Sequence, residues 1–177
     1  MRAVHAIREE AVLAFEQVER AVEGIGEAKA WACLGLQPGE FLHTNGSILA
    51  IVQHLAVCKV IYGSAAFRSL EIRFRDTHAR LEAIETSWPA SLDYLQEAHR
   101  YWMESWQDLQ DGDLERECLH FSGKMWPAWK IIATVTQHDA YHAGQISLLA
   151  SALAPTDQPP DLDLEGEKKY VIDLPTW

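Results

Sequence analysis

The sequence predicts an all-α protein, in which a four-helix bundle is followed by a mostly irregular C-terminal tail. Four segments repeat apolar residues at alternating spacings of three and four, which is the period of a helix with one buried face. Outside the tail, no stretch alternates apolar and polar residues over a useful strand length. The 177 residues, 48% of them hydrophobic, have the size and composition of one globular domain. We therefore expect the bundle to occupy residues 1–153 and the tail residues 154–177.

The first two helices follow from their apolar stripes and their starting residues. Residues 4–25 keep the three-four alternation throughout. The second stripe covers residues 47–65, and either Thr44 or Ser47 can cap the start of that helix, because both side chains offer an oxygen to free backbone N–H groups. We expect this second helix to end in the charged stretch 68–80.

The third and fourth helices carry equally regular stripes. The third spans residues 88–109, with Ser87 as its cap and Pro89 in its first turn, where a missing N–H costs nothing. The fourth spans residues 127–153 and ends before Pro155, which cannot continue a helix. Four helices of about 20–28 residues with stripes of this period are typical of a four-helix bundle.

The tail after the bundle combines three closely placed prolines with alternating acidic residues. Within it, residues 169–174 favour a short strand or an extended segment. The tail is therefore expected to be mostly irregular and to pack on the bundle.

The charge of the chain argues against some classes of binding partner, and its cysteines indicate the cellular compartment. The chain has 15 basic and 26 acidic residues, a formal net charge of −11. This argues against nucleic acids and anionic membranes as partners, because both are bound through Lys and Arg. Cys33, Cys58 and Cys118 have no motif spacing and are interpreted as free thiols of a reducing compartment. With neither a signal-peptide core nor a run of about 20 apolar residues, we expect a soluble, cytoplasmic protein.

Histidines fall on the predicted core stripes of three helices, where Leu, Ile or Val would be ordinary. His138 and His142 lie one turn apart on the fourth helix, with Cβ atoms about 5–6 Å apart, so both rings can bind one cation at about 2.0–2.1 Å. His54 lies in the middle of the second stripe. If these helices pack side by side, the three rings form the protein ligand set of a catalytic zinc-type site. A single histidine on such a stripe is more often a hydrogen-bonded core residue, and this alternative stays open.

Two stretches of the sequence resemble a known family. Residues 135–146, VTQHDAYHAGQI, resemble the last-helix motif of the DinB/YfiT-like superfamily. The Pro-Gly loop at 38–39 and the helix start at 45–56, NGSILAIVQHLA, resemble its second helix. The resemblance covers about residues 1–153 and implies a four-helix bundle that binds a divalent metal, commonly nickel or zinc, through one histidine of the second helix and two of the last. Carried over to this chain, the metal ligands are His54, His138 and His142.

The resemblance also implies a class of chemistry. Characterised relatives include thiol-dependent S-transferases and isomerases, and homodimers are common among them. Because a metal-bound water or thiol becomes a nucleophile near neutral pH, we expect a metal-dependent transferase or hydrolase for a small molecule, with a low-molecular-weight thiol as one substrate class. No motif of the sequence itself specifies a thiol. Two alternatives stay open: a non-catalytic metal-binding or stress-response module with a structural metal, and a bundle whose histidines form only a hydrogen-bonded core network.

The neighbours of these histidines each have two interpretations. Gln145 continues the line of His138 and His142 and could bind metal-bound water or substrate, or be a polar group at the helix end. Tyr141 could donate to a bound substrate, or pack as an ordinary aromatic. Asp139 could orient an imidazole of a neighbouring helix, or form a surface or helix-packing contact. Because Asp stands where a zincin motif has Glu, a metalloprotease is not expected.

Two further residues could add a fourth ligand. His99 lies on the core stripe of the third helix, where the family pattern has no ligand, and a core or pocket-wall histidine is the alternative. Cys58 lies one turn after His54 and would bind zinc strongly as a thiolate, whereas burial raises the pKa of a thiol and leaves it inert. The remaining histidines fall in frayed, loop or charged contexts and are predicted to lie at the surface: His5, His43, His78 and His120.

Overall fold

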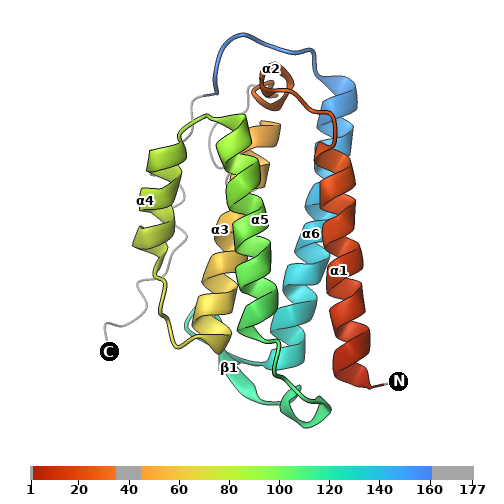
Figure 1. Cartoon of the computed structure of the whole chain (residues 1–177), viewed down its shortest axis with the longest axis vertical. Coiled ribbons are helices and arrows are strands. Elements are labelled where there is room, and N and C mark those ends of the chain that lie inside the picture. The colour runs from red at the N-terminus through yellow and green to blue at the C-terminus, as the bar shows by residue number, and fades with distance from the viewer. Residues whose placement is uncertain (1, 35–44, 161–177) are drawn as a thin grey trace.

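The computed structural model describes residues 2–34 and 45–160 of the chain. Four long helices stand side by side as a bundle (Figure 1), which confirms the predicted all-α fold. They are α1 (Ala3–Val22), α3 (Ile48–Phe67), α5 (Trp88–Ser105) and α6 (Ala128–Ala152). The shorter elements are α2 (Glu27–Ala30), α4 (Phe74–Ile84), the 3₁₀ turn η1 (Asp111–Asp113) and the strands β1 (Glu117–Leu119) and β2 (Met125–Pro127). Most of the predicted tail, including residues 169–174, lies outside the described residues.

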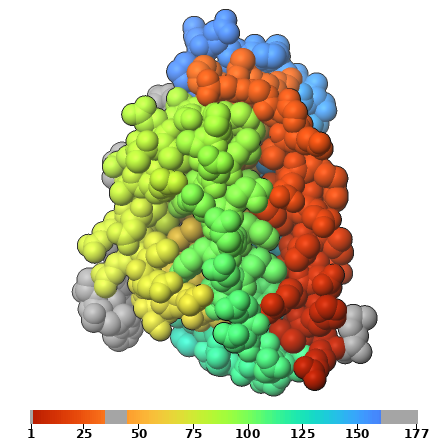
Figure 2. Space-filling view, viewed as in Figure 1, coloured from red at the N-terminus to blue at the C-terminus, as the bar shows by residue number. Residues whose placement is uncertain are grey.

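The central helix of the bundle is α3. It packs against α5 on one side and α6 on the other, and α6 in turn packs against α1. By length and composition alone α3 could cross a membrane, but 83% of its apolar window is buried inside the molecule. Figure 2 shows α1, α4 and α5 closing over it on one face. This burial identifies α3 as the core helix of the bundle.

A side-chain cap marks the start of α3. Ser47 is fully buried, and its Oγ accepts a hydrogen bond from the Ala50 N–H at 3.1 Å. The Ser47 N–H donates in turn to Asn45 Oδ1 at 2.9 Å. Ser47 is therefore the N-cap, whereas the other predicted cap, Thr44, lies outside the described residues. Ser87 caps α5 in the same way, as predicted.

Removal of the Ser47 cap is expected to destabilise the protein by about 1–2 kcal/mol. Ser47→Ala leaves the buried N–H of Ala50 without its acceptor, and a buried unpaired donor is costly. Urea denaturation measures the change. Ser151→Ala is a matched control, because the hydroxyl of Ser151 bonds only a carbonyl on the exposed face of α6, and it should alter stability by less than about 0.5 kcal/mol. Equal stability of the two variants would contradict a capping role.

Three boundaries differ from the prediction. α1 ends at Val22 rather than at residue 25, and the short α2 follows it. α5 ends at Ser105, before the predicted end at residue 109. The charged stretch 68–80 also contains the start of a further helix, α4. Its buried face mixes polar with apolar side chains, which concealed the helical period from a pattern of apolar residues alone: Thr77, His78, Leu81 and Ile84.

An unpredicted hairpin connects α5 to α6. β1 pairs with β2 in antiparallel register, with Cys118 opposite Trp126. Each strand has only three residues, which is too few to show an alternating pattern in the sequence. The hairpin contacts both α3 and α6 and lies across the end of the bundle where α3 ends and α6 begins (Figure 1).

Candidate metal centre

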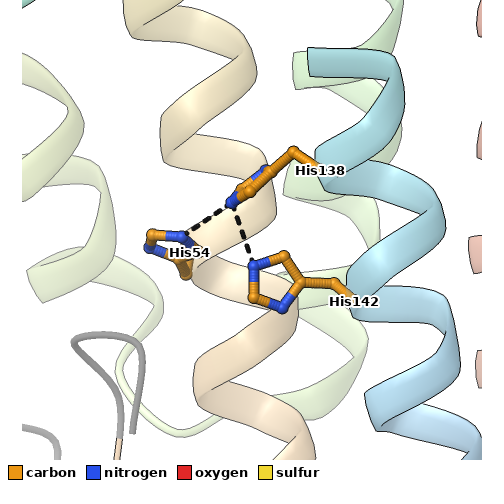
Figure 3. Close-up of side chains that lie close together, drawn as sticks. All are labelled: His54, His138 and His142. Atoms are coloured by element: carbon orange, nitrogen blue, oxygen red, sulfur yellow. Dashed lines mark hydrogen bonds between the residues drawn. The ribbon is translucent and has the colours of Figure 1, made fainter. Parts of the chain in front are cut away.

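Three imidazole rings from α3 and α6 meet inside the bundle. His54 Nε2 lies 3.1 Å from His138 Nε2, and His142 Nε2 lies 2.9 Å from the same atom (Figure 3). The ligand nitrogens of all three residues lie within 4.8 Å of one another. His138 and His142 share one face of α6 because they are one turn apart, and α6 packs against the part of α3 that carries His54. The structure thus brings together the three residues that the sequence indicated.

This cluster is largely shielded from water. His142 is fully buried, and His54 and His138 are partly buried. Burial, followed by the proximity of the other rings, lowers the pKa of His138 to about 2 and that of His142 to about 4. Both rings are therefore neutral at pH 7, which is the form in which imidazole binds a metal.

The spacing of the nitrogens fits a single metal ion. Two nitrogens bound to one ion at about 2.0–2.1 Å lie about 2.9 Å apart at a right angle and about 3.4 Å apart at a tetrahedral angle. The observed separations of 2.9 and 3.1 Å lie in this range. Ring nitrogens at such distances need a proton or a cation between them, because lone pairs that face each other repel. Imidazole ligands suit zinc, nickel, copper and iron alike.

Gln145 follows His142 on α6 and lies close to its ring. His142 Nδ1 and Gln145 Oε1 are both buried and neither makes a hydrogen bond in the described structure, yet Gln145 acts on His142 so as to raise its pKa, against the larger effect of burial. A metal-bound histidine usually donates its other N–H to an oxygen. The side-chain amide of Gln145 therefore lies close enough to the His142 ring to affect its pKa.

Two other side chains lie at the edge of the cluster. Tyr141 is 52% exposed, and its ring packs edge-on against His142 with 5.3 Å between ring centroids. Cys58 Sγ lies 3.6 Å from His54 Nε2, although Cys58 does not belong to the group of converging ligands. The described residues thus place an accessible phenol at the rim of the cluster and a thiol next to one of its rings.

Comparison with known proteins agrees with this geometry. The family model described as the DinB superfamily matches residues 36–146, more than half of the chain. The chain belongs to the DinB superfamily. The part of this DinB-superfamily protein that matches contains all of α3, most of α6 and the three clustered histidines. No curated protein and no solved structure matches the chain significantly.

His99, which the sequence left open as a fourth ligand, lies apart from the cluster of this DinB-superfamily chain. Its ring stacks in parallel on Phe15 of α1, with centroids 3.6 Å apart, and it is not in the group of converging ligands. Burial and, to a smaller extent, the positive charge of Lys59 lower the pKa of His99 to about 3. His99 is therefore a neutral core residue rather than a ligand.

Asp139 pairs with a lysine of α3 rather than with a histidine. Its Oδ2 accepts a hydrogen bond from Lys59 Nζ at 2.5 Å, and its Oδ1 has no hydrogen-bond partner. The side chains of Lys59 and Asp139 are 1% and 2% exposed. The interpretation of Asp139 as a group that orients an imidazole is therefore wrong, and the alternative of a helix-packing contact is confirmed. Burial raises the pKa of Asp139 and lowers that of Lys59, and the attraction between them opposes both shifts.

Lys59 is the residue that the sequence analysis missed. It is the only Asp, Glu, Lys or Arg of α3. A lone charged residue in an otherwise apolar helix is the signal that could have indicated a buried pair, because Lys is almost never fully buried unless paired. The partner could not be deduced from the pattern, since Asp139 lies 80 residues further along the chain.

Two histidines predicted at the surface are buried instead. His78 lies 3.1 Å from Glu82, one turn further along α4. His120 stacks on Trp126 within the hairpin, with 3.9 Å between ring centroids. Both predictions were wrong, because charged or loop-like neighbours in sequence do not reveal what packs over a side chain. The other two are His5, which is exposed as predicted, and His43, which lies outside the described residues.

Proposed function

We propose that this DinB-superfamily protein binds one divalent metal ion through three imidazoles and acts as a metal-dependent enzyme on a small molecule. The observation that carries the proposal is the convergence of three ring nitrogens from two helices on one point. Neutral rings favour metal binding over protonation in that place. Zinc or nickel is the proposed ion, and its ligands are His54, His138 and His142.

Three protein ligands favour an enzyme over a purely structural site. Catalytic zinc-type sites use three ligands and leave one position for water or substrate, whereas structural sites use four. A divalent ion held here would lower the pKa of a bound water or thiol and so supply a nucleophile near neutral pH. Within this proposal, Tyr141 contacts the substrate at the exposed rim, and Gln145 orients His142.

The substrate class and assembly extend the same proposal. A low-molecular-weight thiol is the proposed substrate, with S-transfer or hydrolysis as the reaction, on the basis of the family resemblance. A thiol ligand is chemically compatible with zinc and nickel. A homodimer in the cytoplasm completes the proposal.

The alternative function is a non-catalytic metal-binding module. One observation favours it: Cys58 Sγ lies 3.6 Å from His54 Nε2 and could complete a four-ligand site after a small movement. The cobalt(II)-substituted protein separates the two functions, because added 2-mercaptoethanol changes the cobalt spectrum only if a coordination position is open. An open site supports the enzyme, and a spectrum that ignores the thiol supports the module.

Metal content is the first test of the proposal. We expect about one divalent ion per chain in the untagged protein after incubation with zinc or nickel, and loss of at least nine tenths of it in His142→Ala, as measured by elemental mass spectrometry. His78→Ala is the matched control, because His78 is also buried but lies on α4 outside the cluster. A wild-type protein that holds no ion, or a His142→Ala protein that keeps it, would overturn the metal site.

A further inference from the structure

A buried polar contact lies close to the three clustered histidines and joins the same two helices, α3 and α6. Lys59 of α3 and Asp139 of α6 form a hydrogen-bonded ion pair at 2.5 Å, with both side chains almost completely buried. Asp139 directly follows the ligand His138 in sequence. Lys59 lies five residues after the ligand His54, a rise of about 7.5 Å along the helix. The pair thus connects the two ligand-bearing helices close to the ligands themselves.

The other two long helices also meet at this point. Lys59 Nζ lies 4.9 Å from the ring centroid of Phe15 on α1, in a cation–π contact. The ring of His99 on α5 stacks on the same Phe15 ring, with 3.6 Å between ring centroids. The ammonium group is therefore held by α6 and covered by α1, with α5 packed behind it. Since all four long helices contribute, Lys59 cannot reach water without disturbing the bundle.

A buried ion pair of this kind contributes more to geometry than to stability. The cost of removing two charges from water roughly cancels their attraction, so that well-packed apolar replacements are often equally stable. Apolar contacts between α3 and α6 tolerate small sliding and rotation, because they are not directional. The hydrogen bond between Lys59 and Asp139 is short and directional, so it restricts the axial and rotational register of the two helices.

We propose that Lys59 and Asp139 are positioning residues of the metal site: their contact fixes the register of α3 against α6 in which His54 meets His138 and His142. This inference rests on the proposed metal-binding function. A small change of register moves His54 Nε2, which now lies 3.1 Å from His138 Nε2, relative to the nitrogens of α6, so that the ring of His54 no longer shares one ion with those of His138 and His142. The pair itself touches neither the ion nor a substrate.

The experiment compares two double variants that each remove buried polar contacts of α3. Lys59→Met with Asp139→Leu removes the link to α6. Gln53→Met with Ser91→Ala is the matched control: Gln53 directly precedes His54, and its side chain donates at 3.0 Å to Ser91 Oγ and at 2.7 Å to the Glu85 carbonyl, but these contacts link α3 to α5 and to the end of α4. Cobalt(II) alone is the probe, with affinity measured by chelator competition and the site by its visible absorption.

We expect the first double variant to fold and to bind cobalt(II) about 10–100-fold more weakly than wild type, as is usual when a supporting contact of a metal site is lost, with an altered spectrum. The control should keep its affinity within about threefold, because it leaves the α3–α6 register intact. Wild-type affinity and spectrum in the first variant would overturn the proposal. If that variant does not fold, Asp139→Asn replaces it: this change keeps the shape and removes the charge, so weaker binding supports the proposal and unchanged binding overturns it.

Failure of the metal site and failure of the positioning role are distinguishable. If wild type binds no cobalt(II), the proposed function fails, and the register is measured in the metal-free protein by nitrogen-15 NMR of the imidazoles. The His54–His138 contact should then be visible in wild type and in the control and lost in Lys59→Met with Asp139→Leu. Its persistence in that variant would overturn the positioning role.

Discussion

The metal-free protein should lose stability steeply as the pH falls below about 6.5. In the folded state the pKa values of His99, His138 and His142 are lowered to about 3, 2 and 4, chiefly because burial disfavours the charged ring. In the unfolded chain each takes up a proton near pH 6.5. Between these two values the unfolded state binds more protons, so each histidine removes about 1.4 kcal/mol of stability per pH unit as the pH falls.

The expected slope follows from the three histidines together. Asp139 opposes them, because its raised pKa lets the folded state bind a proton at a higher pH than the unfolded chain. We expect a loss of at most about 4 kcal/mol per pH unit between pH 6 and pH 4.5, reduced by the opposing effect of Asp139, measured by urea denaturation in the presence of a chelator. His99→Phe keeps the stacking on Phe15 and removes one titrating group, so its slope should be smaller by about 1.4 kcal/mol per pH unit. Stability that does not change over this interval would contradict the burial of neutral rings.

The part of the site that could be predicted from sequence is the part set by local spacing. His138 and His142 share a helix face whatever the rest of the fold does, and His54 stands on a stripe that has to face the core. Whether the two helices touch is a tertiary question, and only the packing of α6 against α3 answers it. The family resemblance and the structure agree on this point.

The unpredicted features all depend on contacts between distant segments. α4 has Thr77 and His78 on its buried face, and these residues are covered only because the helix packs back onto α3. His120 is buried by Trp126 through a hairpin of three-residue strands. The sequence places Asp139 about 100° around the helix from His138. Nothing in the neighbouring sequence indicates that its partner is Lys59 of α3.

Lys59→Met should destabilise the protein by about 3–5 kcal/mol, because it leaves the Asp139 carboxylate buried without a partner. This is a large share of the roughly 5–15 kcal/mol that a domain of this size has in total. Asp139→Leu should cost a similar amount, since it strands the Lys59 ammonium beside Phe15. Urea denaturation of both single variants at pH 7.5 measures these losses.

The two substitutions combined should be close to wild type in stability and more stable than either alone. Two apolar side chains of similar volume restore a sealed interface between α3 and α6 without any charge to desolvate. Lys130→Met is the control, because Lys130 is exposed and its ammonium group lies over the ring of Trp126, and it should cost no more than about 1 kcal/mol. Additive losses in the double variant would mean that the pair itself stabilises the fold.

A double variant that regains stability without regaining metal affinity would separate two roles of the Lys59–Asp139 pair: stabilising the fold and positioning the metal ligands. An apolar interface can hold α3 and α6 together as firmly as an ion pair does, because burial of apolar surface is not directional. It cannot select one register with the same sharpness, because no single contact within it has to form at a fixed distance. In that case the role of the Lys59–Asp139 pair is to hold α3 and α6 in the register that brings the three imidazoles together. The free-energy cost of burying the two charges would then be accepted for the geometry of the metal site and not for the stability of the fold.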